Sequence, residues 1–131
     1  MPEGRYALAA GVVDGILYGV GGYNGQDYLK SLKGYDPATN SWTVDPRMRT
    51  PRWLLAASEF DGKLFTIGGK NINGTSNTVE DYNPTTNSWA ENASMPTARS
   101  FLAASVIGHN LYAVGGFDGN VCLRTVEAYN P

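Results

Sequence analysis

The chain begins with two apolar runs separated by a polar pair. Residues 6–13 and 16–20 are mostly apolar or small, and Asp14-Gly15 lies between them. An Asp-Gly pair supplies the positive φ angles of a two-residue type I′ turn, so the pattern predicts a β-hairpin. Because neither run alternates with polar residues, we expect both faces of both strands to be buried.

The following segment is more polar. Residues 29–35 alternate more and include Lys30 and Lys33, which is typical of a strand with one face in water. Residues 36–40 have the turn-forming sequence Asp-Pro-Ala-Thr-Asn, and Trp42 begins another strand. The first third of the chain therefore predicts four consecutive strands joined by short loops.

This pattern returns twice at an interval of 47 residues. The recurring features are a glycine pair after an apolar strand, an arginine, a Tyr-x-Pro, a methionine and, in two of the units, a tryptophan: Gly21-Gly22, Gly68-Gly69 and Gly115-Gly116; Arg5, Arg52 and Arg99; Tyr35, Tyr82 and Tyr129; Met1, Met48 and Met95; Trp42 and Trp89. Glycine in a strand costs about 0.5–1 kcal/mol relative to alanine. The glycine pairs therefore indicate positions where neighbouring backbones approach closely or φ is positive.

A period near 50 residues with these features resembles the kelch repeat, in which each repeat forms one four-stranded blade of a β-propeller. The resemblance covers the whole chain. It implies an all-β fold with three blades, over residues 1–47, 48–94 and 95–131. It also implies that the recurring tyrosines and tryptophans pack between blades and that the arginines tie neighbouring blades by hydrogen bonds. Glu80 and Glu127 match the family's acidic position, whereas Lys33 stands there in the first unit and leaves an Arg–Glu pair open to question.

The third unit departs from the pattern twice. Its first hairpin has Gly108-His109 in place of Asp-Gly, which predicts a type II′ turn with His109 at the tip. No carboxylate, cysteine or second histidine accompanies His109 at ligand spacing, so we expect a solvated turn residue rather than a general base or metal ligand. The unit also ends at Pro131, before the outer strand that the other two units contain.

The resemblance implies binding through loops at one face of the propeller. Peptide-binding kelch domains, which act as substrate receptors of some ubiquitin ligases, use the residue after the arginine, the residue after the glycine pair and the residue five positions further on. In this sequence those positions are Tyr6, Trp53 and Ser100; Tyr23, Lys70 and Phe117; and Tyr28, Thr75 and Cys122. They vary between units while the scaffold positions recur. Five of the nine are aromatic and suit the anchoring of peptide segments or sugar faces.

The composition argues against several classes of binding partner and several kinds of chemistry. Ten basic and twelve acidic residues give a net charge of −2, so we expect no attraction to nucleic acid or to an anionic membrane. No apolar run approaches the ~20 residues of a membrane span, and the N-terminus lacks the pattern of a signal peptide, so the default expectation is a cytoplasmic protein. Cys122 is the single cysteine and cannot form an intrachain disulfide. We expect no metal, no cofactor and no catalytic residue.

Three functional classes fit these observations. A scaffold that binds a peptide or protein segment requires only the aromatic loops. A sugar-binding or mutarotase-like enzyme is the alternative, because kelch-like propellers include a sialic acid mutarotase; a copper-radical oxidase would need paired histidines. The third class is a fragment of a longer kelch protein without an independent role. A role in ubiquitin ligation would require recruitment domains as well.

The repeat count also predicts an assembly. Propellers close with about four to eight blades, and three open blades would expose two apolar faces. Two copies supply six blades. We therefore expect a homodimer that closes one six-bladed ring.

Overall fold

The computed structural model describes all of residues 1–131 and contains antiparallel β-sheets and no helix. The first sheet consists of β1 (Ala9–Val13), β2 (Ile16–Val20), β3 (Leu32–Asp36) and β4 (Ser41–Asp45). The second consists of β5 (Ala56–Phe60), β6 (Lys63–Ile67), β9 (Val79–Asn83) and β10 (Ser88–Asn92). The third consists of β11 (Ala103–Ile107), β12 (Asn110–Val114) and β13 (Val126–Tyr129). The all-β fold is confirmed.

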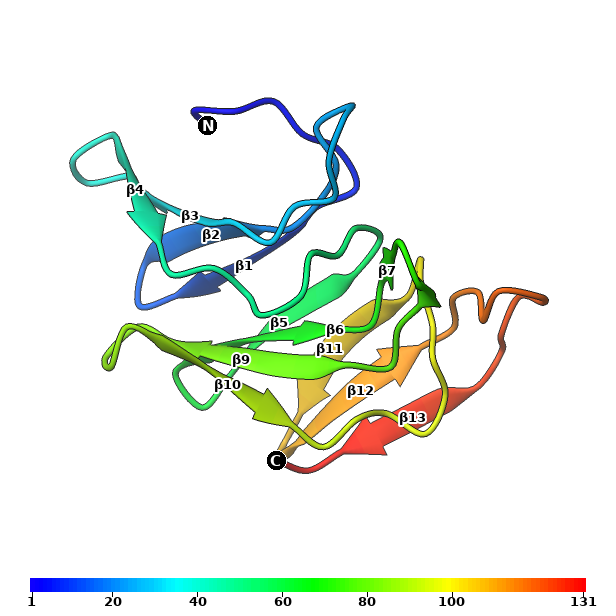
Figure 1. Cartoon of the computed structure of the whole chain (residues 1–131). Coiled ribbons are helices and arrows are strands. Elements are labelled where there is room, and N and C mark those ends of the chain that lie inside the picture. Colours follow the sequence, from blue (N-terminus) through cyan, green and yellow to red (C-terminus); the bar gives the residue numbers. More distant parts are fainter.

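The three sheets share one order and one register. Each begins with a hairpin, and the strand after the following loop returns to pair with the second strand of that hairpin. In the first two sheets a last strand pairs on the outside, with Trp42 opposite Tyr35 and Trp89 opposite Tyr82. The first strands, β1, β5 and β11, follow one another across the three sheets (Figure 1). A short pair, β7 (Lys70–Asn71) and β8 (Gly74–Thr75), extends the loop after β6.

The predicted turns are present. Asp14 and Gly15 have φ angles of 50° and 79°, as a type I′ turn requires. In the third sheet Gly108 has φ 59° while His109 does not have a positive φ, which is the type II′ pattern. His109 is exposed at the tip of that hairpin.

Two apolar clusters hold the sheets face to face. The first cluster lies between the first and second sheets and includes Val20, Leu32, Met48, Leu64 and Tyr82. The second lies between the second and third sheets and includes the residues 47 positions later: Ile67, Val79, Met95 and Leu111, with Tyr129 packed against it. The middle sheet is therefore covered on both faces, while the outer two are covered on one.

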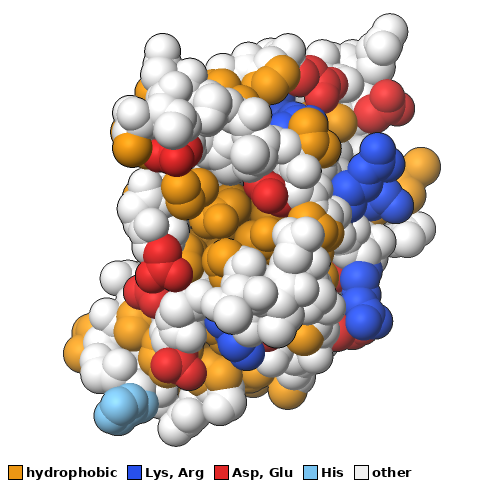
Figure 2. Space-filling view, turned by 90° about the vertical axis from the view of Figure 1, so that its left-hand side faces the viewer, with side chains coloured by type: hydrophobic (Ala, Val, Ile, Leu, Met, Phe, Trp, Pro, Cys, Tyr) orange, Lys and Arg blue, Asp and Glu red, His pale blue; other side chains and the backbone are white.

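The prediction that both faces of the first hairpin are buried is wrong for the first sheet. In the second sheet, the central strand β6 is buried on both faces. Residues 64–67 of β6 are all buried, because a sheet packs on either side of them. Val12 and Leu17, in β1 and β2, are exposed because no sheet covers that face. Figure 2, which views the molecule from the side of the β3–β4 and β9–β10 turns, shows apolar side chains reaching the surface in a hollow of this open stack.

The two tryptophans differ in their surroundings. Trp89 packs against the first cluster and its indole N–H donates to the Pro46 carbonyl at 2.6 Å, so it links the second sheet to the segment after β4. Trp42 lies on Tyr35 with ring centroids 5.1 Å apart, within its own sheet. The predicted role between sheets is confirmed for Trp89. For Trp42 it is corrected, because no sheet lies on that side of β4.

Candidate ligand-binding surface

The nine predicted binding residues come together in three equivalent groups at one end of the sheets. Single β-bridges join Tyr6 to Tyr23 and Tyr23 to Tyr28 in the first sheet. The second sheet joins Trp53 to Lys70 and Lys70 to Thr75, and the third joins Ser100 to Phe117 and Phe117 to Cys122. Each group is a small antiparallel extension of its sheet. The repeat spacing thus places the residue after the arginine beside the residue after the glycine pair.

Four aromatic rings form one cluster across the first and second sheets. The Trp53 ring lies 6.1 Å from Tyr6, 5.6 Å from Tyr23 and 5.6 Å from Tyr28, measured between ring centroids. Tyr23 also lies 5.6 Å from Tyr6 and 5.4 Å from Tyr28. These separations are in the range of favourable aromatic pairs. Because most of the pairs are edge-on or tilted, the cluster is a three-dimensional surface rather than a flat stack.

Exposure varies among the nine residues. Tyr6, Lys70 and Cys122 are exposed, and Cys122 is a free thiol. Tyr23, Tyr28, Trp53, Thr75 and Phe117 are half-buried. Ser100 is buried, and its hydroxyl donates to the Phe117 carbonyl at 3.4 Å. The Trp53 indole N–H is buried beneath its neighbours and has no hydrogen-bond acceptor in the chain.

Three further residues at this end have unusual backbone angles that the sequence analysis did not identify. Ala7, Leu54 and Phe101 follow the first residue of each group and have φ angles of 56°, 57° and 56°. Positive φ is unfavourable for residues with a side chain. Hydrogen bonds between sheets offset this cost: the Leu54 N–H donates to Ala7 at 2.8 Å and the Phe101 N–H donates to Leu54 at 2.9 Å. The interval of 47 residues was the signal that could have found them.

The loop between the second and third member of each group is held by a short polar side chain. Asn24 accepts hydrogen bonds from the backbone N–H groups of Gln26 and Asp27 at 2.9 and 2.8 Å. Asp118 occupies the same repeat position and accepts both equivalent bonds, and Asn71 accepts one of them, from the Asn73 N–H at 2.8 Å. The N–H groups of Val121 and Asn120 lower the pKa of the Asp118 carboxyl. These turns present the group members in a similar arrangement in all three sheets.

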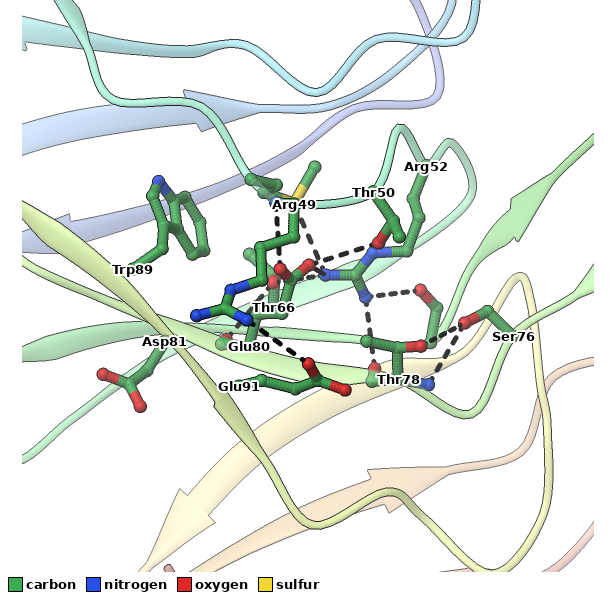
Figure 3. A network of polar contacts seen from close by, with 12 residues as sticks. Arg49, Thr50, Arg52, Thr66, Ser76, Thr78, Glu80, Asp81, Trp89 and Glu91 are labelled. Atoms are coloured by element: carbon green, nitrogen blue, oxygen red, sulfur yellow. Dashed lines mark hydrogen bonds and ion pairs between the residues drawn. The ribbon is translucent and has the colours of Figure 1, made fainter.

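The recurring arginines support this end of each sheet from inside. The Arg52 guanidinium donates to the Gly68 and Thr78 carbonyls at 2.8 and 3.1 Å, to the Thr66 hydroxyl at 2.7 Å and to Glu80 at 2.8 Å (Figure 3). Burial lowers the pKa of Arg52, and the charge of Glu80 opposes that shift. Arg99 repeats this arrangement with Gly115, Thr125 and Glu127.

Arg52 and Arg99 each join two sheets, as expected. The backbone of each arginine bonds to one sheet and its side chain bonds to the other. The Arg52 N–H donates to Leu29 at 3.0 Å and its carbonyl accepts from Gly22 at 2.8 Å, both in the first sheet, while its guanidinium binds the second. In the first sheet Lys33 occupies the acidic position, and Arg5 pairs instead with Glu3 at 3.4 Å. The open question about Arg5 is thereby answered.

The first glycine of each of the first two pairs lies where two sheets touch. Gly21 has φ 67°, and a Cβ there would overlap the Arg52 carbonyl oxygen of the second sheet. Gly68 has φ 62° and is equally close to the Arg99 carbonyl oxygen of the third sheet. Only glycine satisfies both conditions. The expectation of close backbone approach is confirmed at these two positions.

Comparison with known proteins identifies this repeat. Residues 4–49, 54–96 and 98–131 each match the family model for the Kelch motif. The chain belongs to the kelch-repeat family. The three matched stretches contain the three sheets in order, so each kelch motif folds into one sheet with its glycine pair. Arg5 and Arg99 lie inside their matched stretches, and Arg52 lies two residues before the second.

Among curated proteins, the chain is similar to a mouse protein described as "Influenza virus NS1A-binding protein homolog". The two sequences are 39% identical over 52 residues, which are 40% of this chain and 8% of that protein. The matched segment is therefore a small part of the mouse protein. By its name, that protein is a homologue of one that binds another protein.

The structure contains no group of three or more histidine, cysteine, aspartate or glutamate side chains placed to hold a metal ion. It contains no helix long and apolar enough to cross a membrane.

Proposed function

We propose that this kelch chain is a protein-binding scaffold that captures a peptide or protein segment on the nine-residue surface. The observation that carries the proposal is the cluster of Tyr6, Tyr23, Tyr28 and Trp53, four rings within 6.1 Å of a neighbour at the loop end of two sheets. Rings held on a rigid scaffold lose little conformational entropy on binding. The name of the mouse relative, which describes a homologue of a protein that binds influenza virus NS1A, supports the same functional class.

The chemistry of the surface favours an extended segment with an apolar or aromatic anchor. Exposed Lys70 follows the aromatic cluster in the second sheet, bridged to Trp53, and offers a cation to an acidic side chain. Aromatic anchors beside a charged rim are the usual composition of binding hot spots. The buried Trp53 N–H would gain an acceptor if a ligand carbonyl reached it.

Selection from a random dodecapeptide library tests the proposal. Tyr6 is the best variant position because it is exposed and its backbone bridge to Tyr23 does not need the ring. Tyr6→Ala should weaken selected peptides at least tenfold and leave the melting temperature near wild type. Val44→Ala, at an exposed position on β4, is the control and should change neither. If no peptide is selected and the chain instead binds a saccharide from a test panel, the proposal is overturned in favour of a sugar site.

We further propose that three kelch blades, residues 1–47, 48–94 and 95–131, associate with three from a second copy into one six-bladed ring. The open faces support this. Val126 of the third sheet is 56% exposed, whereas its equivalent in the second sheet, Val79, is 1% exposed. On the opposite face of the stack, Leu17 is 38% exposed and its equivalent Leu64 is fully buried. Both faces have the composition of a sheet contact and no sheet against them.

Unused backbone groups at the two ends are complementary. At the third sheet, Gly116 N–H, Leu123 C=O and Phe101 C=O make no hydrogen bond. At the first sheet, Arg5 C=O, Arg5 N–H and Ala7 N–H make none. The equivalent groups 47 residues away form backbone hydrogen bonds at both contacts between sheets. Between the first and second sheets these bonds join Gly22 with Arg52, Arg52 with Leu29, and Leu54 with Ala7. Between the second and third sheets they join Gly69 with Arg99, Arg99 with Ser76, and Phe101 with Leu54. If the third sheet of each copy packs against the first sheet of the other in the same way, all six groups form hydrogen bonds in both copies.

Gly115 gives this assembly a sharp test. A Cβ at Gly21 or Gly68 would strike the backbone of the next sheet, but at Gly115 it would approach only Leu123 O, at 3.5 Å. In the ring, Gly115 would face Arg5 of the second copy. We therefore expect the Gly115→Ala variant to be a folded monomer of 14.1 kDa by light scattering, and the wild-type chain to have about twice that mass. Gly108→Ala is the matched control, with φ 59° against 64° and open space around it. A folded wild-type monomer at micromolar concentration overturns the ring and leaves the peptide proposal standing.

A further inference from the structure

A cleft on the first sheet carries an excess of positive charge. It lies between the N-terminal segment and the outer strands β3 and β4 (Figure 1) and has a volume of about 320 Å³. The charged residues that line it are Glu3, Lys30, Lys33, Asp45 and Arg47. The volume is at the lower end of the range for ligand pockets, ~300–1,000 Å³, so the cleft suits one side-chain group rather than a nucleotide.

The three cations of this cleft have no anionic partner in the chain. Lys30, Lys33 and Arg47 take part in none of the ion pairs. Lys33 and Arg47 are half-buried, and a cation that loses water without gaining a counter-ion is unfavourable. The cleft is therefore electrostatically complementary to an anion.

The two carboxylates of the cleft are already engaged. Both oxygens of Glu3 accept hydrogen bonds, one from buried Arg5 at 3.4 Å and the other from Asn24 at 2.8 Å. Asp45 accepts a hydrogen bond from Thr43 at 3.0 Å. When Arg5 is counted with the three cations of the cleft, four cations and two carboxylates leave a surplus of two positive charges.

The second sheet shows that the scaffold does not require these cations. At the three equivalent positions it has neutral or acidic residues: Asn77, Glu80 and Ser94. Glu80 accepts a hydrogen bond from Thr50, the equivalent of Glu3, and Glu91 pairs with Arg49 at 3.7 Å. The same segment of the repeat therefore borders both regions, but only the second sheet balances its charges within the chain.

Tyr28 joins the cleft to the nine-residue surface. Its ring lies 5.6 Å from that of Trp53 in the aromatic cluster, and it also lines the cleft. Lys30 is two positions further along the chain. An extended segment that lies across the aromatic rings therefore reaches the cleft with a neighbouring side chain.

We propose that the cleft binds a phosphoryl group, carried on a side chain of the segment that the nine-residue surface captures. A phosphoryl group has a charge of about −1.5 to −2 at pH 7, which offsets the surplus, and its three oxygens accept hydrogen bonds from Lys30, Lys33 and Arg47. The planar guanidinium of Arg47 binds two of these oxygens at once. A carboxylate carries one charge and two oxygens, so it would leave a cation unpaired. The peptide as the source of the phosphoryl group rests on the proposed function, whereas the affinity of the cleft for that group does not.

A phosphoserine derivative tests the cleft without the aromatic surface. The probe is N-acetyl-phosphoserine amide, titrated into the ¹⁵N-labelled 131-residue chain. The amide signals of Lys30, Ser31, Lys33 and Arg47 should shift and reach saturation. The same compound without the phosphoryl group should leave these signals unchanged. If the phosphoserine derivative moves none of them, the proposal is overturned.

Two variants take their residues from the second sheet, so both are expected to fold. Lys33→Glu and Arg47→Ser, checked by circular dichroism, should each lower the affinity for the phosphoserine derivative by about tenfold or more. Arg124→Glu is the matched control, because it makes the same change of charge as Lys33→Glu at an exposed arginine that forms no ion pair. It should leave the affinity nearly unchanged. An equal loss in the control would mean that only the overall charge attracts the probe, which overturns the site.

Phosphorylated peptides test the source of the group. In a peptide selected on the nine-residue surface, phosphoserine is placed at each position in turn. At one position near the cleft it should raise the affinity about tenfold or more for the wild-type chain and not for Lys33→Glu. If no position does so, or if inorganic phosphate binds as tightly as the phosphoserine derivative, the peptide is not the source. If Tyr6→Ala leaves the selected peptides bound, the proposed function fails, while the phosphoserine titration still decides whether the cleft binds a phosphoryl group.

Discussion

The three recurring arginines provide an internal comparison of one interaction at three degrees of burial. Their acidic partners are Glu80, Glu127 and Glu3, whose side chains are 1%, 17% and 43% exposed. The Arg–Glu distances are 2.8, 2.9 and 3.4 Å, while each arginine side chain is fully buried. Replacement of each glutamate by glutamine removes one negative charge with little change of shape.

The largest loss should follow Glu80→Gln. Both carboxylate oxygens of Glu80 accept hydrogen bonds: one from the Arg49 backbone N–H at 2.9 Å, the other from Arg52 at 2.8 Å and from the Thr50 hydroxyl at 3.3 Å. Glutamine replaces one acceptor oxygen with a donor that faces another donor. Breaking a buried ion pair from one side costs about 3–5 kcal/mol. A chain of this length is typically stable by about 7–20 kcal/mol, so the loss is a large fraction of the total.

The other two substitutions should cost less stability, and the loss should be smaller where the glutamate is more exposed. Glu3 is the most exposed of the three glutamates and lies farthest from its arginine, so Glu3→Gln should cost about 1 kcal/mol, at the upper end of the range for exposed ion pairs. Glu127→Gln should fall between the two. Urea denaturation at pH 7, followed by tryptophan fluorescence at one fixed protein concentration, gives the three free energies of unfolding. Raising the salt concentration should reduce the Glu3 contribution and leave that of Glu80 nearly unchanged. Equal losses at Glu3 and Glu80 would refute the reasoning from burial.

Three further predictions follow from the contacts between sheets. Trp89→Ala should cost about 3–5 kcal/mol of stability, as for a large aromatic removed from a packed site, and Trp42→Ala distinctly less, because only Trp89 joins two sheets; similar denaturation midpoints would contradict this. Burial, together with the charge of Asp45 and the neighbouring Tyr18, raises the pKa of Tyr82 to about 12. The unfolded chain therefore loses this proton first, near pH 10, and stability should decline between pH 10 and 12; Tyr82→Phe should make the decline shallower in denaturation series across that range. Gly68→Ala should destabilise the chain more than Gly115→Ala at the same protein concentration, since both have φ near 60° but only Gly68 faces another sheet's backbone within the chain; equal melting temperatures would count against it.

The sequence alone determined the strands, the turns and the spacing of the candidate site. Asp14-Gly15 and Gly108-His109 specify their turns through local φ preferences, which depend on a few bonded neighbours. The interval of 47 residues gives Tyr6, Tyr23 and Tyr28 of the first sheet one equivalent each in the second and third sheets, so the three equivalent groups followed from the repeat. The meeting of these three rings with Trp53 did not follow, because it depends on the angle and distance between two sheets.

Tertiary structure decided every property that depends on what covers a sheet. Leu17 and Leu64 occupy the same repeat position and have the same side chain, yet one is exposed and the other buried. Trp42 and Trp89 likewise have matching local sequences, and only Trp89 contacts a neighbouring sheet. Local sequence sets which face of a strand is apolar, whereas burial free energy depends on whether another surface removes that face from water.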